Sequence, residues 1–244
     1  MTALLQAESD GLLTLTLNRP EARNALNTEL AEALRAACRH AVATHAKLVI
    51  VRATGPIFCA GADLKERQGM SDDAVRARRL KSFAAYGALE SLPMPTIAVV
   101  EGPAIGSGVE IGAACDLIVS TPAATFRTPE ALWGTVGATQ RLPRILGKRL
   151  AKDLMFTGRT LSAAEALAAG LVARLVEPDA LEETLGGIAT KILKASPAAM
   201  ALAKRCIDEG LERDPRGALA TELLAVEESL AAAEWRSRMA GFGG

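Results

Sequence analysis

Apolar residues recur with two different periods along the first half of the chain. Leucine and threonine alternate over residues 12–17, which is the period-two pattern of a strand. Short runs rich in β-branched or aliphatic residues predict further buried strands, at residues 47–51, 96–100 and 117–119. The longer segments predict helices, at residues 27–43 with Asn27 as N-cap, 72–92 and 106–115. This alternation predicts parallel strand pairing and an α/β fold.

The pattern becomes more helical after about residue 148. Ser162 and Glu165 form a capping box for a short helix, and Gly170 is well placed to end it. Ser196, followed by proline, predicts a helix that runs to about Gly210. We therefore divide the chain into a core over residues 1–195 and a C-terminal helical region over residues 196–244.

A last helical stretch is predicted over residues 215–239. Its apolar side chains form a stripe, at Leu219, Leu223, Val226 and Leu230. Such a stripe has little core of its own to pack against, so we expect it to bind another part of the assembly.

Composition narrows the class of protein. With 244 residues the chain is long enough for one large core. Lys+Arg and Asp+Glu both number 28, which argues against a bulk field for nucleic acid or an anionic membrane. The four cysteines include no Cys-x-x-Cys and are accompanied by two histidines, so neither a disulfide framework nor a metal site is predicted. No stretch reaches membrane-spanning length. We expect a cytoplasmic protein without membrane or nucleic-acid partners.

The candidate chemistry lies in two glutamates and two glycine turns. Glu110 closes the segment Gly-Pro-Ala-Ile-Gly-Ser-Gly-Val-Glu at residues 102–110, and Glu130 ends Arg-Thr-Pro-Glu. A second turn, Phe-Cys-Ala-Gly-Ala-Asp, covers residues 58–63. Taken singly, each glutamate is more often a solvated surface residue. Together, two carboxylates and two turns with exposed N–H groups can polarise a carbonyl and move a proton and a water across its α,β bond.

These segments, in this order, resemble the enoyl-CoA hydratase/isomerase (crotonase) superfamily. The resemblance extends over nearly the whole chain, through motifs at residues 17–26, 58–65, 102–115, 139–143, 156–166 and 170–172. It implies an α/β fold that is a spiral of ββα turns, with a C-terminal helical trimerisation region. The expected assembly is a homotrimer, possibly paired into a hexamer.

The resemblance also implies roles for single residues. The N–H groups of Ala62 and Ser107 would receive a thioester carbonyl, with Glu110 and Glu130 as the catalytic pair. Isomerase members generally keep only the second glutamate, so the presence of both favours hydration of a trans-2-enoyl-CoA. The coenzyme A thioester is then the substrate, and no other cofactor is expected. Coenzyme A contacts are implied for Ala22, Arg23, Ala60 and Lys65, and an acyl-pocket position for Trp133.

One segment departs from the family pattern. Residues 134–139 form a shorter loop than usual before Thr-Gln-Arg-Leu and lack its proline. Because this loop lies behind Glu130 and lines the acyl pocket, we expect weak activity on short straight-chain enoyl-CoAs. Either the preferred acyl group differs or the loop is disordered without ligand.

Three other interpretations can be built from the sequence, of which the second fails in detail. The first is another acyl-CoA reaction of the same family, by a double-bond isomerase or a hydrolase. The second is a dinucleotide site built on Gly106 and Gly108 with Glu130 as the ribose acid, although Gly112 comes one position late for that motif. The third is a non-enzymatic RNA-binding role, which the neutral charge balance and scarce aromatics disfavour.

Overall fold

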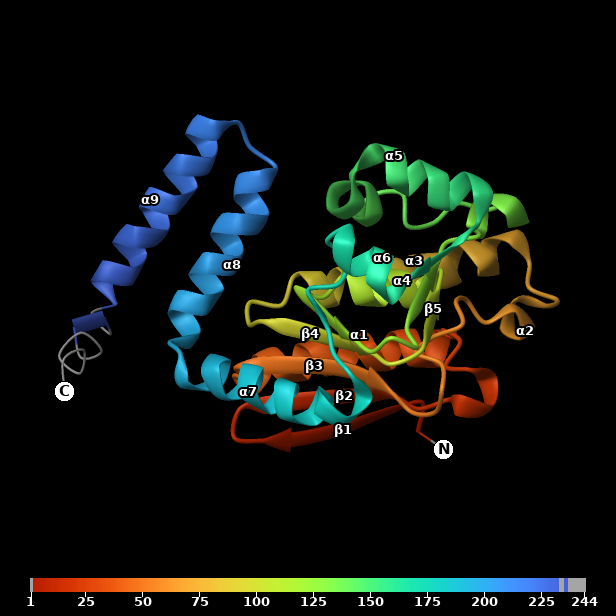
Figure 1. The fold of residues 1–244 in the computed structure, drawn as a ribbon, viewed down its shortest axis with the longest axis horizontal. Helices are drawn as coiled ribbons and strands as arrows, with labels where there is room; N and C mark the ends of the chain where they lie inside the picture. The colour runs from red at the N-terminus through yellow and green to blue at the C-terminus, as the bar shows by residue number, and fades with distance from the viewer. Residues whose placement is uncertain (1, 233–234, 237–244) are drawn as a thin grey trace.

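Figure 1 shows the computed structural model, which describes residues 2–232 and 235–236. Within this part of the chain the strands form a six-stranded sheet in the order β1-β2-β3-β4-β6-β9 and a three-stranded sheet in the order β5-β7-β8. The strands are β1 (Leu4–Ser9), β2 (Leu12–Leu17), β3 (Leu48–Ala53), β4 (Thr96–Val100), β5 (Pro103–Ile105), β6 (Leu117–Ser120), β7 (Thr125–Arg127), β8 (Thr160–Ser162) and β9 (Arg174–Leu175).

Successive segments of the chain add strands to both sheets. In the large sheet β2, β3, β4, β6 and β9 are parallel neighbours, and only β1 runs antiparallel to β2. The pair β4 and β5 contributes one strand to each sheet, and β6 and β7 do the same one position further along. Each ββ unit therefore moves the chain by one strand in both sheets, which confirms the predicted spiral.

The helices also follow the predicted positions where caps and apolar periods are strong. Asn27 accepts a hydrogen bond from the N–H of Leu30 at 2.9 Å, and the capping box of Ser162 and Glu165 is formed. Two of the longer helices, α5 and α7, were not predicted. The α-helices are α1 (Thr28–Ala43), α2 (Leu64–Arg67), α3 (Asp72–Glu90), α4 (Ser107–Ala113), α5 (Arg141–Thr157), α6 (Ala163–Ala168), α7 (Leu181–Lys194), α8 (Pro197–Leu211) and α9 (Pro215–Ala231). Short 3-10 turns are η1 (Pro20–Ala22), η2 (Glu130–Trp133) and η3 (Pro178–Ala180).

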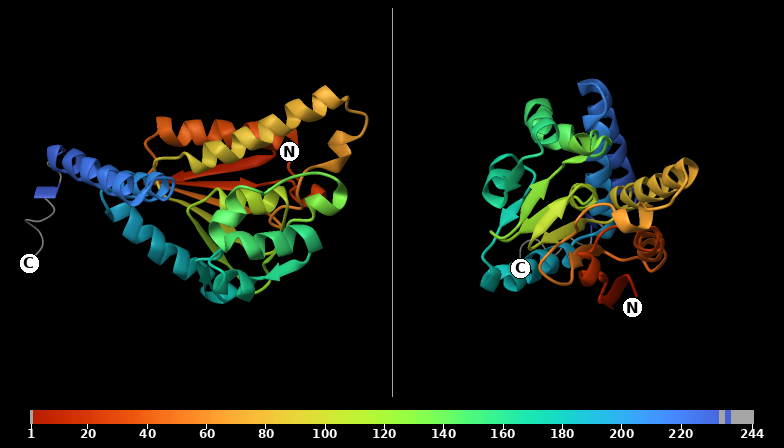
Figure 2. Two further views of the ribbon diagram at one scale, coloured as in Figure 1. Left: turned by 90° about the horizontal axis from the view of Figure 1, so that it is seen from above. Right: turned by 90° about the vertical axis from the view of Figure 1, so that its right-hand side faces the viewer.

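The large sheet is buried on both faces. In β3, Val49 and Val51 face one core with Leu30 of α1, whereas Leu48 and Ile50 face a second core with Leu185 of α7. Figure 2 shows α1 and α3 on one side of the sheet and α7 on the other. A strand that is covered on both faces needs apolar side chains on both. Residues 48–51 are therefore all apolar and show no alternation of apolar and polar residues.

The C-terminal helices form a hairpin beside this body. Helices α8 and α9 run next to each other and project away from the sheets (Figures 1 and 2). The stripe residues of α9 keep exposed fractions of 44–56% in this chain, at Leu219, Leu223, Val226 and Leu230. Helix α9 ends at Ala231; of the remainder of the predicted stretch, residues 233–234 and 237–239 lie outside the described residues. No helix in the described ranges is both long enough and apolar enough to cross a membrane.

Candidate active site

A cavity of about 340 Å³ lies where the N-terminus of α4 meets the turn before α2, the middle of α3 and the η2 segment. The structure brings six of the sequence-predicted residues onto its wall. They are Ala60, Ala62, Ser107, Glu110, Glu130 and Trp133. Segments that are far apart in the chain thus supply one lining.

The backbone N–H groups of Ala62 and Ser107 in this lining form no hydrogen bond to an acceptor among the described residues. Around Ala62, Gly61 and Asp63 use their backbone groups to bond Leu26, and this leaves the intervening N–H unused. Ser107 is the first residue of α4, where an N–H has no partner within the helix. Unpaired N–H groups at such positions can stabilise a developing oxyanion.

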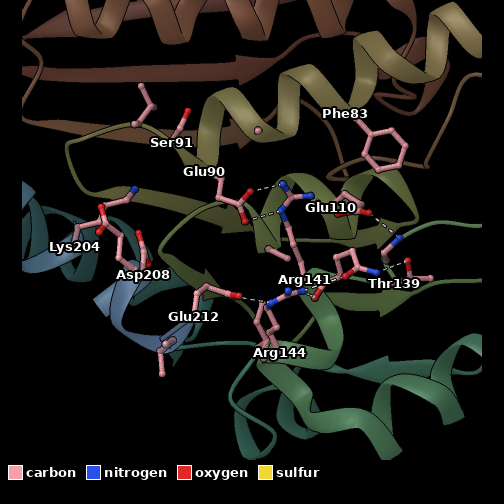
Figure 3. A pocket seen from close by; sticks show the side chains of 18 of the residues that line it. Phe83, Glu90, Ser91, Glu110, Thr139, Arg141, Arg144, Lys204, Asp208 and Glu212 are labelled. Carbon is pink, nitrogen blue, oxygen red and sulfur yellow. Dashed lines mark hydrogen bonds and ion pairs between the residues drawn. The ribbon is translucent and has the colours of Figure 1, made fainter. Parts of the chain in front are cut away.

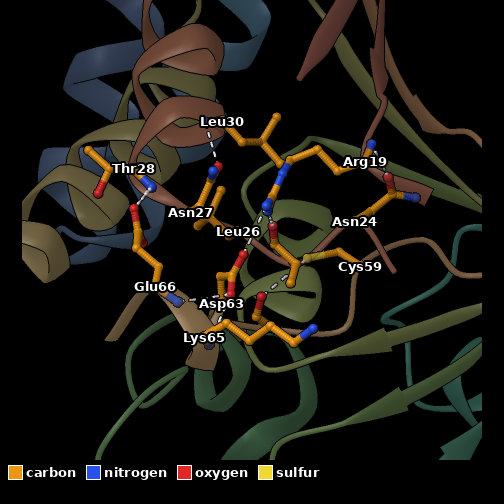
Figure 4. Close-up of polar contacts among 12 residues, drawn as sticks. Arg19, Asn24, Leu26, Asn27, Thr28, Leu30, Cys59, Asp63, Lys65 and Glu66 are labelled. Carbon is orange, nitrogen blue, oxygen red and sulfur yellow. Dashed lines mark hydrogen bonds and ion pairs between the residues drawn. The ribbon is translucent and has the colours of Figure 1, made fainter. Parts of the chain in front are cut away.

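The carboxylate of Asp63 fixes the turn that contains Ala62. One oxygen of Asp63 accepts from the N–H groups of Lys65 and Glu66 at 3.0 and 3.2 Å, and the other pairs with Arg19 at 3.0 Å. Burial raises the pKa of Asp63, but the Glu66 N–H and Arg19 outweigh it and leave that pKa below its usual value. Figure 4 shows Asp63 between these partners. The ionised carboxylate therefore fixes the turn.

Glycine is required where the second turn approaches its neighbours. A Cβ at Gly108 would lie 2.5 Å from the carbonyl oxygen of Cys59, and one at Gly106 would lie 2.5 Å from Oε1 of Glu130. Gly106 also has a φ of 49°. Ser107 between them is an ordinary helical residue, so the side chain at this position leaves its backbone donor in place.

Glu110 lies in the first turn of α4 and is 5% exposed. Its Oε1 accepts a hydrogen bond from the N–H of Ala138 at 2.7 Å. Its Oε2 forms an ion pair with Arg141 at 3.0 Å. Both oxygens are thus engaged by donors, one from the backbone and one from a guanidinium.

Glu130 has a different environment. It opens η2, and its Oε2 is buried without a hydrogen-bond partner among the described residues. Burial, and next the charge of Glu110, raise the pKa of Glu130. The two carboxyl groups of this cavity therefore differ in their partners: Glu110 pairs with a cation, and Glu130 forms no ion pair among the described residues.

Of the implied coenzyme A residues, Ala60 lines the cavity, and Ala22, Arg23 and Lys65 are not part of its lining. The carbonyl of Arg23 accepts from the N–H of Ala60 at 3.0 Å, which brings the loop with Ala22 against the cavity wall. Lys65 is exposed on α2 and does not line the cavity. Contacts of these four residues with coenzyme A stay a prediction.

Three residues of this site were missed in the sequence. Tyr86 and Phe83 of α3 line the cavity, and Tyr86, the chain's single tyrosine, was a visible signal. Burial raises the pKa of the Tyr86 phenol above its usual range. Arg79 of α3 donates to Thr135 and to the carbonyl of Val136, and thereby holds the short loop. Every residue of that loop, 134–139, lies within the described part of the chain.

Cysteine chemistry does not compete for this site. Burial raises the pKa of the Cys59 thiol to about 12, so the thiol stays protonated and is a poor nucleophile at neutral pH.

Comparison with known proteins defines the class. The sequence profile of the enoyl-CoA hydratase/isomerase family matches residues 7–242. The chain belongs to this family. It is 36% identical over 247 residues to human enoyl-CoA hydratase domain-containing protein 2, covering 98% of this chain and 85% of that protein. It is 38% identical over 228 residues to human methylglutaconyl-CoA hydratase, covering 89% and 67%.

Solved structures agree with the topology. The crystal structure of an enoyl-CoA hydratase from Bacillus anthracis superimposes with a TM-score of 0.94 at 33% identity, over 98% of this chain and 95% of that one. The dinucleotide-binding interpretation is therefore wrong. Gly106 and Gly108 open a helix that follows a strand of the small sheet, and they do not open the first βαβ unit of a doubly wound sheet.

Proposed function

We propose that this protein is an enoyl-CoA hydratase, which adds water across the α,β double bond of a trans-2-enoyl-CoA. The observation that carries the proposal is the arrangement around one cavity: two N–H groups without an acceptor lie beside two glutamates, of which Glu110 pairs with Arg141 and Glu130 has a raised pKa. The hydratase names of its relatives support the same choice. An acyl-CoA thioester is the substrate, and no additional cofactor is needed for this chemistry.

In the proposed mechanism the thioester carbonyl accepts from the N–H groups of Ala62 and Ser107, which stabilise the enolate-like transition state. Ionised Glu110 takes a proton from water as the water oxygen bonds to Cβ. Protonated Glu130 gives its proton to Cα. The net change is the addition of one water, and a proton passing from Glu110 back to Glu130 restores the resting state. General acid and base steps of this kind typically contribute ~10²–10⁴-fold each.

The decisive experiment is incubation with a panel of enoyl-CoAs, followed by mass spectrometry for the gain of one water. Water addition supports the hydratase. A shifted double bond without water addition would assign an isomerase, and release of free coenzyme A would assign a hydrolase. Saturated acyl-CoA and single-stranded RNA, titrated in parallel, separate thioester binding from the RNA-binding alternative.

The first prediction concerns the catalytic pair. Glu110→Gln and Glu130→Gln keep size and shape but remove the base and the acid, so each variant should lose at least ~10²-fold in hydration rate. Steady-state assays on crotonyl-CoA, with circular dichroism to verify folding, measure this. A folded variant that retains most of its activity would contradict the base role of Glu110 or the acid role of Glu130.

The oligomeric state and the location of the protein are also proposals. We propose a homotrimer or a hexamer, assembled through the hairpin of α8 and α9, because the apolar stripe of α9 is exposed in the single chain. A cytoplasmic location is proposed from the dispersed, unpaired cysteines.

A further inference from the structure

The carboxylate of Glu110 depends on one cation. Among the ion pairs of the described residues, only Arg141 contacts it, through Nη1 to Oε2 at 3.0 Å. The two side chains are 6% and 15% exposed. A carboxylate this buried keeps its charge only if donors and a nearby cation replace the lost water. The Ala138 N–H supplies a donor, and Arg141 supplies the charge.

Arg141 is itself fixed from another element. Its Nε and Nη2 donate to the two oxygens of Glu90 at 3.0 and 2.5 Å. Its guanidinium also lies 5.9 Å from the ring centre of Tyr86. Figure 3 shows Arg141 between Glu90 and Glu110. Because a two-pronged arginine–carboxylate pair has a fixed geometry, α3 determines where the third nitrogen points.

We propose that Arg141 is a positioning residue for hydration: it keeps Glu110 ionised and holds its carboxylate in place, and so decides which glutamate is the base. This rests on the proposed hydratase function. The titratable and charged groups around Glu110 are Arg141 of α5, Glu130 of η2 and Tyr86 of α3. Glu130 forms no ion pair among the described residues, so of the two carboxyls it is the one that keeps the proton.

Glu90 has a second effect in this arrangement. It shares the charge of Arg141, since the guanidinium lies between two carboxylates. An arginine without such a counter-charge would stabilise the ionised form of Glu110 more strongly and weaken it as a base. The shared cation thus orients the base without removing its affinity for the proton of water.

The test compares two arginines on one helix. Arg141→Gln removes the cation from Glu110. Arg144→Gln, one turn further along α5, removes an exposed pair with Glu212 at 2.9 Å and hydrogen bonds to Gln140. It leaves the cation of Glu110 in place. For Arg141→Gln we expect kcat on crotonyl-CoA to fall on the order of 10- to 100-fold, with KM changed less than about threefold. The acidic limb of its pH–rate profile should move to higher pH, and Arg144→Gln should match the wild type in both respects.

A second variant separates charge from shape. Arg141→Lys keeps the charge but loses the fork, so it should restore part of kcat and return the acidic limb toward the wild type. This variant decides the matter if Arg141→Gln does not fold by circular dichroism. A wild-type pH profile in folded Arg141→Gln, a fully wild-type kcat in Arg141→Lys, or an equal loss in Arg144→Gln would overturn the proposal.

A direct titration makes the test independent of turnover. In protein labelled with ¹³C at the glutamate carboxyls, the resonance missing from Glu110→Gln belongs to Glu110. That resonance should titrate at higher pH in Arg141→Gln than in the wild type, and an unchanged midpoint would overturn the inference. If the wild type hydrates no enoyl-CoA, the proposed function is wrong, while this titration still decides the role of Arg141.

Discussion

At the scale of single residues, the site separates two chemically identical side chains by their surroundings. Glu110 has an arginine and a backbone donor on its two oxygens, whereas Glu130 has a buried oxygen without a partner among the described residues. The two carboxyl groups therefore lie in different surroundings, and burial raises the pKa of Glu130. An enzyme that must take one proton and give another needs this difference before substrate arrives.

The raised pKa of Glu130 predicts a cost in stability that depends on pH. Above its usual value of 4.5, an unfolded chain has released this proton while the folded chain still holds it. The folded state then binds more protons, so this group's contribution falls as pH rises through the raised pKa. Glu130→Gln has no such proton. We expect its melting temperature, relative to the wild type, to increase between pH 4 and pH 8.

The control for that measurement is Glu21→Gln, an exposed glutamate of η1. Its difference in melting temperature from the wild type should stay flat over the same range. A flat difference for Glu130→Gln as well would show that Glu130 is ionised in the folded protein, contrary to the acid role.

Residue types and spacing were enough to predict the two glutamates and the two N–H turns as a candidate site. Local turns and the start of a helix fix the positions of these groups. Arg141 lay in a motif, Thr-Gln-Arg-Leu, that was recognised without a role. Its partners Glu90 and Glu110 lie 51 and 31 residues away in the chain. No local pattern encodes such contacts, and they appear only once α3, α4 and α5 are packed.

At the scale of elements, the short loop over residues 134–139 is the most distinctive segment. Arg79 holds it through Thr135 and Val136, and Ala138 donates to Glu110. Gly137 packs against Glu130, since a Cβ there would lie 3.2 Å from its Oε1. Glu110 and Glu130 therefore both contact this loop, and we expect its length to affect the position of each.

We expect weak hydration of crotonyl-CoA by the wild type for this reason, since a displacement of ~1 Å in a catalytic group can cost on the order of a hundredfold in rate. Insertion of glycine and proline residues, to restore the length usual in the family, should raise turnover of crotonyl-CoA. Stopped-flow or steady-state kinetics measure both proteins. Turnover by the wild type above roughly 10³ per second would mean that the short loop is neutral.

Elements with strong local signals were predicted well. Strand β2 and helices α1 and α3 follow clear periods and caps, and their starts agree with the structure. The strands of the small sheet are only three residues long, too short for a period to show. Helix α5 contains Pro143 and a non-helical Gly147, which hide it from propensity arguments.

At the scale of the whole molecule, the hairpin of α8 and α9 offers apolar surface that the single chain does not cover. Leu211 and Ile207 of α8 are 82% and 62% exposed, in addition to the stripe of α9. Exposed apolar surface of this kind marks a protein interface. The division at residue 195 stays a prediction, but the hairpin is where the chain leaves the body of the molecule (Figure 1).

Light scattering at micromolar concentration should give the mass of a trimer or a hexamer. The double variant Leu219→Asp and Leu223→Asp places charges on the stripe and should shift the mass toward the monomer. Leu80→Asp, on an exposed position of α3 that is 69% accessible, is the matched control and should leave the mass unchanged. A monomeric wild type would rule out the proposed assembly.

The isolated β-bridges between Leu26 and Ala62 and between Cys59 and Ala104 join the two donor turns across separate stretches of the chain. Arg141, which pairs with Glu110, comes later still in the chain. During synthesis, a nascent chain that has left the ribosome only as far as Ser107 lacks both glutamates and this cation. Under the proposed mechanism we therefore expect a product that ends before Glu110 to have no hydratase activity.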